Sequence, residues 1–536
     1  MKRNIFLGVF AYFVYLVLDW QQIHLVEALL LLSMLCFVPI TMILVGNDRK
    51  GDRLVKYVFT IYPLAVLCAV LAIVTDMFFF SVVWFGFTIL ITMLGLSRLL
   101  ERGWKPISET AIDFGLIYLG VGGFWFLAYV SEVEILSFSS LTNLLTAIHF
   151  HYSAFVIPIC VGFIGRKLMS RRRLYSLVAL VIIVSPMTIA AGITISRTLE
   201  FIAVTVYVLA LIFYAFFVFN THFQRKLAKF LVSFSAAVLL VTISFSLIYA
   251  FGGISSSVTI TIPTMIFIHG VVNAFGVVLP ALVGWLLEDT APAYPYYKKP
   301  MSGLFGQKII GEEFLMKQKL IEDSGYKGLV DQMSNYSSDY FDDKKLSTAI
   351  VHFYERTSEF DLKANIHWAA WFKPFAYLYG KISKHVQQLH LGMGKKWETM
   401  EGEIIGVNST RDGREKVRAW VRKNEQQESI FVALYSKHTS AGETYMNIAL
   451  PLPLSNMTGI LKLRNEGKNL ILTSKLRPDG SGDEGIYLRS RYMTIRLPLS
   501  ETFVITEREH NQLEANHKMW VFGLPFLAID YQIQIR

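Results

Sequence analysis

The chain has 536 residues, of which 53% are apolar and only 17% are charged, and its formal net charge is +10. This composition excludes a single water-soluble globule, in which charged residues make up about 25%, and it equally excludes a disordered chain. Residues 1–290 carry 18 Lys and Arg against 13 Asp and Glu, whereas residues 291–536 carry 33 against 28. The positive charge is thus shared evenly between a membrane half and a soluble half, and it does not indicate nucleic-acid binding.

The first half contains ten long apolar runs. A membrane-spanning helix needs about 20 apolar residues to cross a hydrocarbon layer of about 30 Å, and each run approaches that length. The runs lie near residues 5–20, 25–45, 54–74, 77–97, 111–130, 140–164, 174–195, 201–219, 230–250 and 262–286. We therefore predict an α-helical polytopic membrane bundle of about ten transmembrane helices over residues 1–290.

Lys and Arg are distributed unevenly over the connections between these runs. One alternate set of connections, which includes the N-terminus, holds 17 of them, whereas the other set holds only Arg197. Positively charged loops stay on the cytoplasmic side of a membrane. The pattern predicts cytoplasmic N- and C-termini, a linker over residues 291–302 that is rich in Pro and Tyr, and a cytoplasmic domain over residues 303–536.

Histidines lie inside two of the predicted spans. The sixth span contains His149 and His151, and the tenth contains His269 followed by Asn273. At ~1.5 Å per helical residue, His149 lies ~13 Å and His269 ~10 Å below the outer face, so the three imidazoles share roughly one depth. An ionisable residue at such a depth is costly and is a functional hypothesis by default. We predict an intramembrane polar site from these four residues.

Helical geometry limits what this site can do. His149 and His151 are separated by about 200° of rotation and cannot both bind one ion in a regular helix, which argues against a metal site. His269 and Asn273 are four residues apart and share a face. Polar residues at the outer ends of neighbouring spans are secondary candidates for the same cluster: His24, Glu27, Arg197 and Glu200. The alternative is that the imidazoles are hydrogen-bonded between helices and only specify packing.

The first part of the soluble half, residues 303–395, favours helices. Residues 344–359 place apolar side chains at i, i+3 and i+4, as an amphipathic core helix does. Residues 366–382 mix aromatic and basic side chains, a composition that fits either the headgroup plane of a membrane or packing against a neighbouring sheet.

After residue 400 the pattern changes to short strands separated by turn residues. We predict strands at 403–407, 416–422, 430–436, 444–450, 469–473, 492–497, 502–506 and 529–535. Alternating apolar residues in the last of these indicate an antiparallel sheet with one buried face. The predicted domain is thus of the α+β class, helical over 303–395 and β-rich over 400–536.

The usual catalytic templates do not occur in the chain. It lacks a P-loop lysine pattern, a Gly-x-Ser-x-Gly elbow, the kinase motifs and His-Glu-x-x-His, and no Cys lies in the second half. No catalytic residue and no cofactor is predicted, although a metal or haem held by the intramembrane histidines stays an alternative. Whether the protein is an enzyme is left open.

Four segments resemble the YndJ-like family of bacterial multi-pass membrane proteins. They are residues 146–155 around His149 and His151, residues 269–276 from His269 to Gly276, residues 445–453 and residues 482–487. The resemblance covers the full chain. It implies a multi-pass protein of the bacterial plasma membrane and brings no established activity with it.

Three functions remain open on this basis. The first is a protein that binds or moves a small or lipid-like ligand through the histidine site in the outer half of the bilayer, coupled to the cytoplasmic domain. The second is a metal- or haem-dependent membrane enzyme, and the third is a sensor or scaffold whose spans only anchor the soluble domain. The lipid bilayer is the one partner predicted in all three, the oligomeric state is not predicted, and nucleic acid is not expected.

Overall fold

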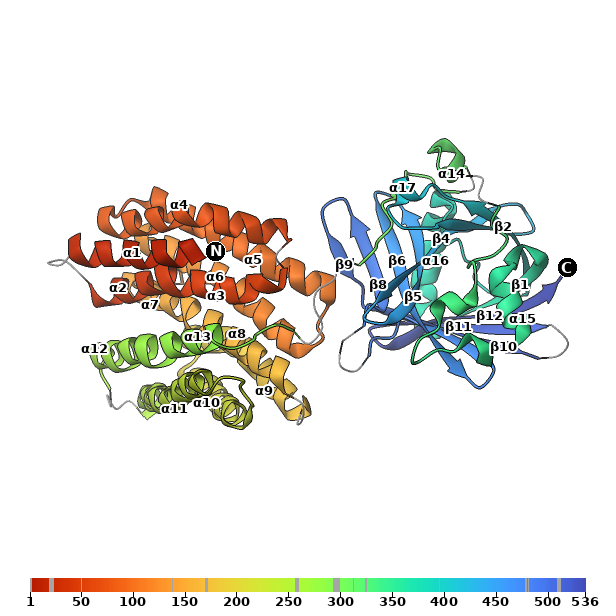
Figure 1. Ribbon diagram of the computed structural model, residues 1–536. Helices are drawn as coiled ribbons and strands as arrows, with labels where there is room; N and C mark the ends of the chain where they lie inside the picture. Colours follow the sequence, from red (N-terminus) through yellow and green to blue (C-terminus); the bar gives the residue numbers. More distant parts are fainter. Residues whose placement is uncertain are drawn as a thin grey trace. The chain divides into compact units, whose positions relative to one another are not determined.

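The computed structural model describes residues 2–18, 24–49, 51–136, 138–168, 172–255, 260–292, 299–311, 313–322, 325–394, 396–477, 480, 482–508 and 512–536. The chain divides into two compact units, of which the first is Met1–Leu99 with Trp104–Tyr296 and the second is Leu100–Gly103 with Tyr297–Arg536. The first unit is helical and the second is built around β-strands (Figure 1).

The helical unit follows the predicted spans closely. Its elements are α1 (Lys2–Leu18), α2 (Leu25–Leu32), η1 (Ser33–Phe37), α3 (Val38–Gly46), α4 (Arg53–Thr75), α5 (Phe78–Arg102), α6 (Ile107–Val130), α7 (Ser140–His151), α8 (Ser153–Lys167), α9 (Arg172–Ile195), α10 (Arg197–Asn220), α11 (Lys226–Ser255), α12 (Ile262–Met265), η3 (Ile266–Val271), η4 (Asn273–Val278) and α13 (Leu279–Leu286). Nine helices in the described part are long and apolar enough to cross a membrane, and α1 occupies the first predicted span with 17 residues. The prediction of a polytopic helical bundle is confirmed.

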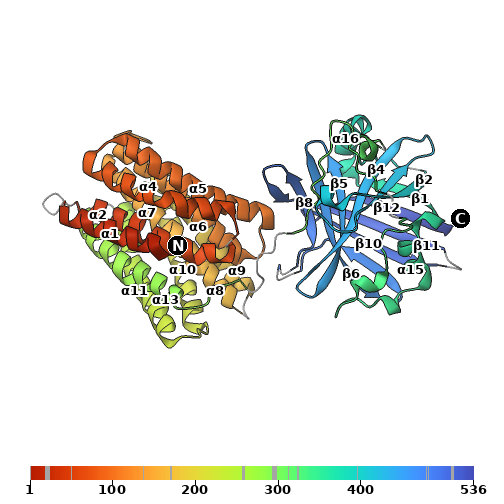
Figure 2. The ribbon, with the colours of Figure 1, turned by 45° about the horizontal axis from the view of Figure 1, so that its top comes forward.

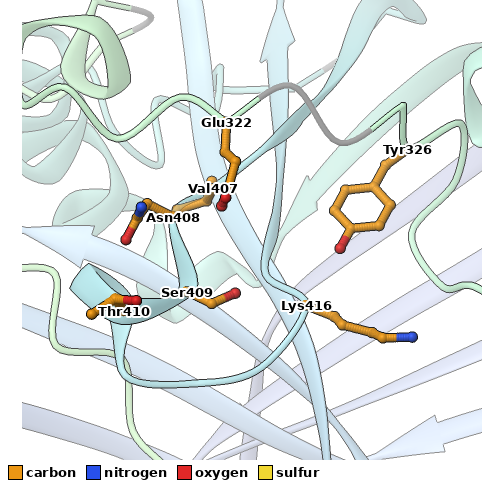
Figure 3. Close-up of a pocket in the computed structure, with 7 residues that line it drawn as sticks. All are labelled: Glu322, Tyr326, Val407, Asn408, Ser409, Thr410 and Lys416. Carbon is orange, nitrogen blue, oxygen red and sulfur yellow. The ribbon is translucent and has the colours of Figure 1, made fainter.

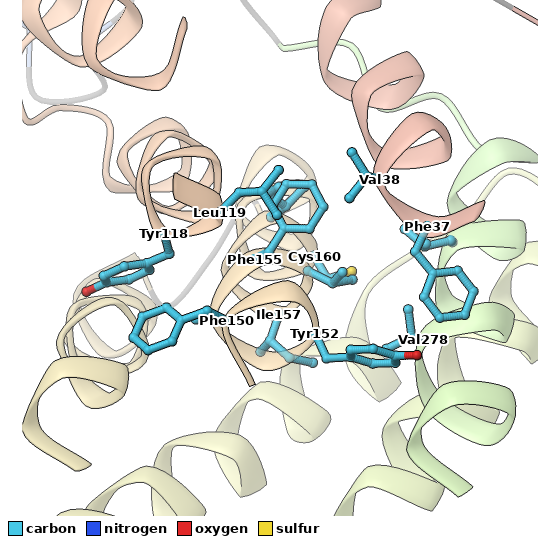
Figure 4. Close-up of a cluster of buried hydrophobic side chains, with 14 of the residues drawn as sticks. Phe37, Val38, Tyr118, Leu119, Phe150, Tyr152, Phe155, Ile157, Cys160 and Val278 are labelled. Carbon is cyan, nitrogen blue, oxygen red and sulfur yellow. The ribbon is translucent and has the colours of Figure 1, made fainter. Parts of the chain in front are cut away.

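The centre of this unit is packed around α7 and α8. Phe150, Tyr152 and Phe155 lie among side chains of α6 and of the segment at Phe37 (Figure 4). Close approach of the helices depends on small residues, since a Cβ at Gly115 of α6 would lie only 2.6 Å from the main-chain oxygen of Phe155. Small residues at helix contacts replace the hydrophobic driving force that lipid does not supply.

Buried ion pairs join several helices near one end of the bundle. Arg98 of α5 binds Asp113 at 2.6 Å and Glu109 at 3.1 Å, both on α6. Arg166 of α8 donates two hydrogen bonds to the same Glu109, at 2.6 and 2.8 Å. Because Arg98 and Asp113 are almost fully buried, each charge depends on the other. These charges connect α5, α6 and α8.

The second unit contains twelve strands in its described part: β1 (Phe360–Trp368), β2 (Glu398–Gly406), β3 (Arg418–Lys423), β4 (Ser429–Ser440), β5 (Glu443–Leu452), β6 (Ser455–Glu466), β7 (Asn469–Thr473), β8 (Gly485–Ser490), β9 (Thr494–Arg496), β10 (Leu499–Glu507), β11 (Leu513–Val521) and β12 (Leu524–Ile535). Every pairing is antiparallel, which confirms the predicted sheet.

The sheet closes into a barrel, which the sequence did not predict. Strands β1 to β7 follow one another around the ring, and β10, β11 and β12 complete it because β7 pairs with β10 and β12 pairs with β1. The hairpin of β8 and β9 extends from the first half of β6. Closure leaves the ring strands without free edges (Figure 2).

Short helices lie around the barrel: α14 (Phe314–Lys317), α15 (Thr348–Glu355), α16 (Lys373–Val386) and α17 (Ser409–Asp412). The second unit also has 3-10 turns at Met333–Tyr336, Asp343–Lys345, Thr357–Glu359 and Ala370–Phe372, and the first unit has one at Asn47–Arg49. Ile350 and Phe353 of α15 join the barrel core, and the main-chain N–H of Ser347 bonds to Lys468 in the β6–β7 turn. The α15 helix therefore closes the end of the barrel at that turn.

The structure differs from the sequence prediction in the stretch 303–395. The helix expected over 344–359 is shortened to α15, and β1 lies within the stretch expected to be helical. In β1 the buried residues Phe360, Leu362, Ala364 and Ile366 alternate with more exposed ones, which is the period of a strand. Strands β6, β8 and β11 were also absent from the prediction.

Candidate functional site

Three helices of the first unit lose regular α-helical geometry where they meet. The second span is π-helical at η1, the tenth is π-helical at η3 and η4, and the sixth breaks at Tyr152, whose φ of −105° and ψ of −79° separate α7 from α8. Irregular backbone is tolerated in a bilayer only where side chains, protein or water satisfy the displaced polar groups. Such π turns are rare and often mark functional sites.

Side chains from neighbouring helices satisfy main-chain groups at these irregular segments. Tyr62 donates a hydrogen bond of 2.7 Å to the carbonyl oxygen of Leu35 in η1. Ser33 bonds to the carbonyl of His151 at 3.1 Å, and Tyr152 to that of Leu29 at 2.6 Å. The second and sixth spans are thus tied together at their irregular segments.

His149 and His269 face each other at this junction. Their ring centroids are 6.4 Å apart and the rings are inclined by 29°. Nδ1 of His149 lies 2.7 Å from the carbonyl oxygen of Leu145, one helical turn earlier. Because that oxygen can only accept, Nδ1 carries the proton and Nε2 is left as an acceptor. His149 is exposed at the surface of the helical unit and His269 is half-buried.

His269 has two competing partners at the same nitrogen. Its Nδ1 lies 3.2 Å from the carbonyl oxygen of Thr242 and 3.2 Å from the amide nitrogen of Asn273. The Nδ1-protonated tautomer donates to Thr242, whereas the other tautomer accepts from Asn273. The Thr242 hydroxyl donates to Oδ1 of Asn273 at 2.6 Å and holds that amide in place. The ring can therefore exchange its proton position without losing all its partners.

His151 does not belong to this pair. Its Nε2 accepts a hydrogen bond of 3.2 Å from Nε1 of Trp84, and its Nδ1 donates to the carbonyl oxygen of Ala147 at 2.8 Å. The side chain is fully buried between α5 and α6, against Gly122. Both ring nitrogens are satisfied by the protein, so His151 is a packing residue, and the structure does not bring it into the predicted site with His149, His269 and Asn273.

The secondary candidates lie apart from the facing histidines. Glu27 accepts a hydrogen bond from Tyr129 of α6, and Arg197 bonds to Glu200 at 2.7 Å within the first turn of α10. His24 is exposed at the start of α2. None of the contacts found among the described residues joins these four side chains to His149 or His269.

Two hydroxyl groups that were not predicted from the sequence lie beside His269. Thr242 and Ser246 both lie on α11, and the Ser246 hydroxyl is 3.5 Å from both ring nitrogens of His269. Ser and Thr occur throughout the apolar runs, usually bonded to a carbonyl of their own helix. Hydropathy therefore gave no reason to single out these two.

A metal site is not assembled in the described part of the chain. No group of three or more His, Cys, Asp or Glu side chains there has a geometry that could hold a metal ion. The two facing imidazoles alone supply fewer protein ligands than a zinc centre uses.

A polar pocket of about 290 Å³ lies on the second unit (Figure 3). Its lining consists of Glu322, Tyr326, Val407, Asn408, Ser409, Thr410 and Lys416. The Asn408 side chain caps α17 by accepting a hydrogen bond from the main-chain N–H of Arg411. The Lys416 ammonium bonds to Asp331 at 2.9 Å. These two polar side chains already have structural roles, and among the described residues that line the pocket no nucleophile is paired with a base.

Several histidines of the second unit are paired with carboxylates. His352 bonds to Glu359 at 2.8 Å, and His517 bonds to Glu501 at 3.0 Å inside the barrel. His438 lies 3.3 Å from Asp483. Each pair joins neighbouring segments of the fold, so these histidines are explained by structure.

Comparisons with known proteins extend over both units. A family model described as YndJ-like protein matches residues 28–277. The protein named "Uncharacterized membrane protein YndJ" of Bacillus subtilis (strain 168) is 46% identical over 536 residues, and the alignment covers 99% of this chain and 98% of that relative. No solved structure matches the chain.

Proposed function

Because this chain belongs to the YndJ-like family of membrane proteins, we propose that it binds and moves a small polar or lipid-like ligand at the site formed by His149 and His269. The proposal places this site in the outer half of the bacterial plasma membrane and the β-barrel unit in the cytoplasm. Binding at the imidazoles is coupled to the barrel unit through the helices.

The observation that carries the proposal is the facing pair of imidazoles between two irregular helices. The ring centroids of His149 and His269 are 6.4 Å apart, and neither side chain is fully buried. Discontinuous helices that present polar groups within a bundle are typical of ligand sites in secondary transporters. A packing role alone explains His151, whose two nitrogens are bonded within the protein, but it leaves Nε2 of His149 without a hydrogen bond to any described residue.

The chemistry of the pair suits a ligand that both donates and accepts hydrogen bonds. Nε2 of His149 offers an acceptor, and His269 changes from donor to acceptor when its proton moves between its two nitrogens. This exchange uses Thr242 and Asn273 as alternate partners. A proton taken up with the ligand would be held at His269, which makes His269 the proton carrier of the proposed movement.

The test compares what purified full-length protein retains. Wild-type protein and the His149→Gln/His269→Gln variant are purified in mild detergent, and retained small molecules and lipids are identified by mass spectrometry. We expect at least one species to be retained by the wild type and lost from the variant. His367→Gln is the matched control, because His367 is half-exposed on β1 and bonds to Asp530.

The control variant should retain the same species as the wild type. If wild type and the double variant carry the same molecules in the same amounts, the histidine site does not bind a ligand. The chain would then be better described as a sensor or scaffold that is anchored by its spans.

A further inference from the structure

The α16 helix exposes its largest apolar side chains. Phe375, Leu378 and Ile382 lie along one side of the helix and, with Trp371 just before it, are between 46% and 60% exposed. The residues that α16 buries are small, namely Ala376 and Ser383. The helix is therefore amphipathic, with its apolar side turned away from the domain that carries it.

The exposed apolar surface continues onto the neighbouring turn of the barrel. Nε1 of Trp371 donates a hydrogen bond of 3.0 Å to the carbonyl oxygen of Pro525, which places the β11–β12 turn beside the start of α16. That turn carries Phe522 and Leu524, which are 79% and 59% exposed. We call the six side chains the α16 face: Trp371, Phe375, Leu378, Ile382, Phe522 and Leu524.

The α16 face lies at one end of the barrel. Phe372, which precedes the helix, packs on Phe526 of β12 at a centroid distance of 4.7 Å. Near the C-terminal end of α16, Lys384 lies 3.8 Å from Glu428 in the β3–β4 turn. In the antiparallel ring the start of β12 and the β3–β4 turn belong to the same end, opposite to the end that α15 closes.

The charge carried by α16 itself has one sign, although Glu428 of the β3–β4 turn lies 3.8 Å from Lys384. Lys373, Lys381 and Lys384 lie on α16, and residues 373–386 contain neither Asp nor Glu. The Lys381 ammonium lies 4.8 Å from the centre of the Tyr377 ring, and Tyr377 is also exposed. Aromatic and apolar side chains flanked by lysines are the composition of helices that lie in the headgroup region of anionic membranes.

We propose that the α16 face docks on the anionic surface of the lipid bilayer. The ten residues between Leu286 of α13 and Tyr297 span at most about 36 Å when fully extended, so the barrel unit is kept close to the bilayer that the helical unit crosses. An exposed apolar patch of this kind marks an interaction surface. The short tether, the lysines and the aromatic side chains favour lipid as its occupant.

This inference does not depend on the histidine site, because it concerns the second unit alone. It also resolves the two interpretations left open for residues 366–382. Residues 366–368 belong to β1 of the sheet and Phe372 packs on Phe526 of β12, whereas the apolar residues of α16 turn outward.

The experiment uses full-length protein in nanodiscs of phosphatidylcholine with phosphatidylglycerol. Leu378→Cys is labelled with an environment-sensitive fluorophore, and quenching by doxyl-labelled lipid is compared with quenching by aqueous iodide. Lys344→Cys is the matched control, because Lys344 is exposed on a 3-10 turn near α15. The parent chain, whose cysteines Cys36, Cys68 and Cys160 are buried, gives the background.

We expect doxyl lipid to quench most of the emission at position 378 and little at position 344, with iodide showing the reverse. Replacing Lys373, Lys381 and Lys384 by Gln, or omitting phosphatidylglycerol, should reduce the lipid quenching several-fold. Phe375→Cys repeats the measurement at a second exposed position. The proposal is overturned if position 378 is as open to iodide as position 344, or if it is shielded without lipid quenching, which would indicate coverage by a second copy or by another protein surface.

Discussion

The indole Nε1 of Trp84 on α5 donates a hydrogen bond to Nε2 of His151 on α7 across 3.2 Å, and both side chains are fully buried. This bond separates the roles of two histidines that lie only two residues apart. His151 is held by the protein, whereas His149 is exposed at the surface of the helical unit and faces His269.

We predict that His151→Phe destabilises the protein and that His149→Gln does not. Removing the acceptor leaves the Trp84 N–H buried without a partner, which costs about 1–3 kcal/mol. Thermal unfolding of the purified full chain in detergent measures the difference. Equal unfolding temperatures for the two variants would contradict the separate roles assigned to them.

The ion pair of Arg98 and Asp113 should be essential for stability. Arg98→Gln removes the guanidinium that pairs with the buried Asp113 carboxylate, and breaking a buried pair in this way costs about 3–5 kcal/mol. Arg197→Gln is the control, because the Arg197 side chain is 61% exposed and its pair with Glu200 is expected to contribute less than about 1 kcal/mol.

Urea or thermal unfolding monitored by helical circular dichroism checks this prediction. The double variant Arg98→Met/Asp113→Leu should recover much of the stability, since it removes both charges at once. A loss in Arg98→Gln no larger than that in Arg197→Gln would show that the buried pair is not needed.

The barrel unit should lose stability in acid through Asp331. Burial by itself would raise the pKa of Asp331, but hydrogen bonds from Arg418 at 2.6 Å and Lys416 at 2.9 Å lower it below its usual value. A carboxylate with a lowered pKa stabilises the folded state above its unfolded pKa, near pH 4, and this contribution disappears as the pH falls through the folded pKa.

Asp331→Asn should therefore be less stable than the wild type at neutral pH and equal to it in acid. The measurement is the denaturant midpoint of the barrel unit's unfolding in the full chain, followed by near-ultraviolet circular dichroism at a series of pH values. A difference that stays constant down to about pH 2 would mean that Asp331 is not the group responsible.

The proposed orientation is tested by labelling cysteines in cells. Glu134→Cys, in the exposed connection between α6 and α7, should react with an impermeant maleimide in intact cells. Lys344→Cys in the barrel unit should react only after permeabilisation, because the positively charged loops keep that side in the cytoplasm. Reaction of Lys344→Cys in intact cells would place the barrel unit outside and reverse the proposed topology.

Prediction from the sequence worked where the information is local. The boundary between α4 and α5 was predicted at Thr75 and Asp76, and the structure ends α4 there with Asp76 at a positive φ of 54°. The facing of His149 and His269, in contrast, depends on contacts between helices that are distant in the chain. Their similar depth was inferred from helical rise, but which of two histidines turns toward the tenth span depended on how α7 packs against α5 and α6.

In the second unit the strands were predicted in part. The alternation in β12 was recognised, whereas the same alternation in β1 was missed because it lies next to an amphipathic helix in a region judged helical. Barrel closure could not be foreseen, since β1 pairs with β12 through partners such as Phe360 and Ile535 that lie far apart in the chain.

The sequence by itself determined that the first half consists of membrane helices and the second half contains an antiparallel sheet, because hydrophobic run length and periodicity are properties of neighbouring residues. Only the tertiary structure decided that the sheet closes, that His151 is bonded to Trp84 while His149 is not, and that α16 turns its apolar side outward. Those outcomes depend on contacts between residues distant in the chain, whose packing and hydrogen-bond partners no local pattern records.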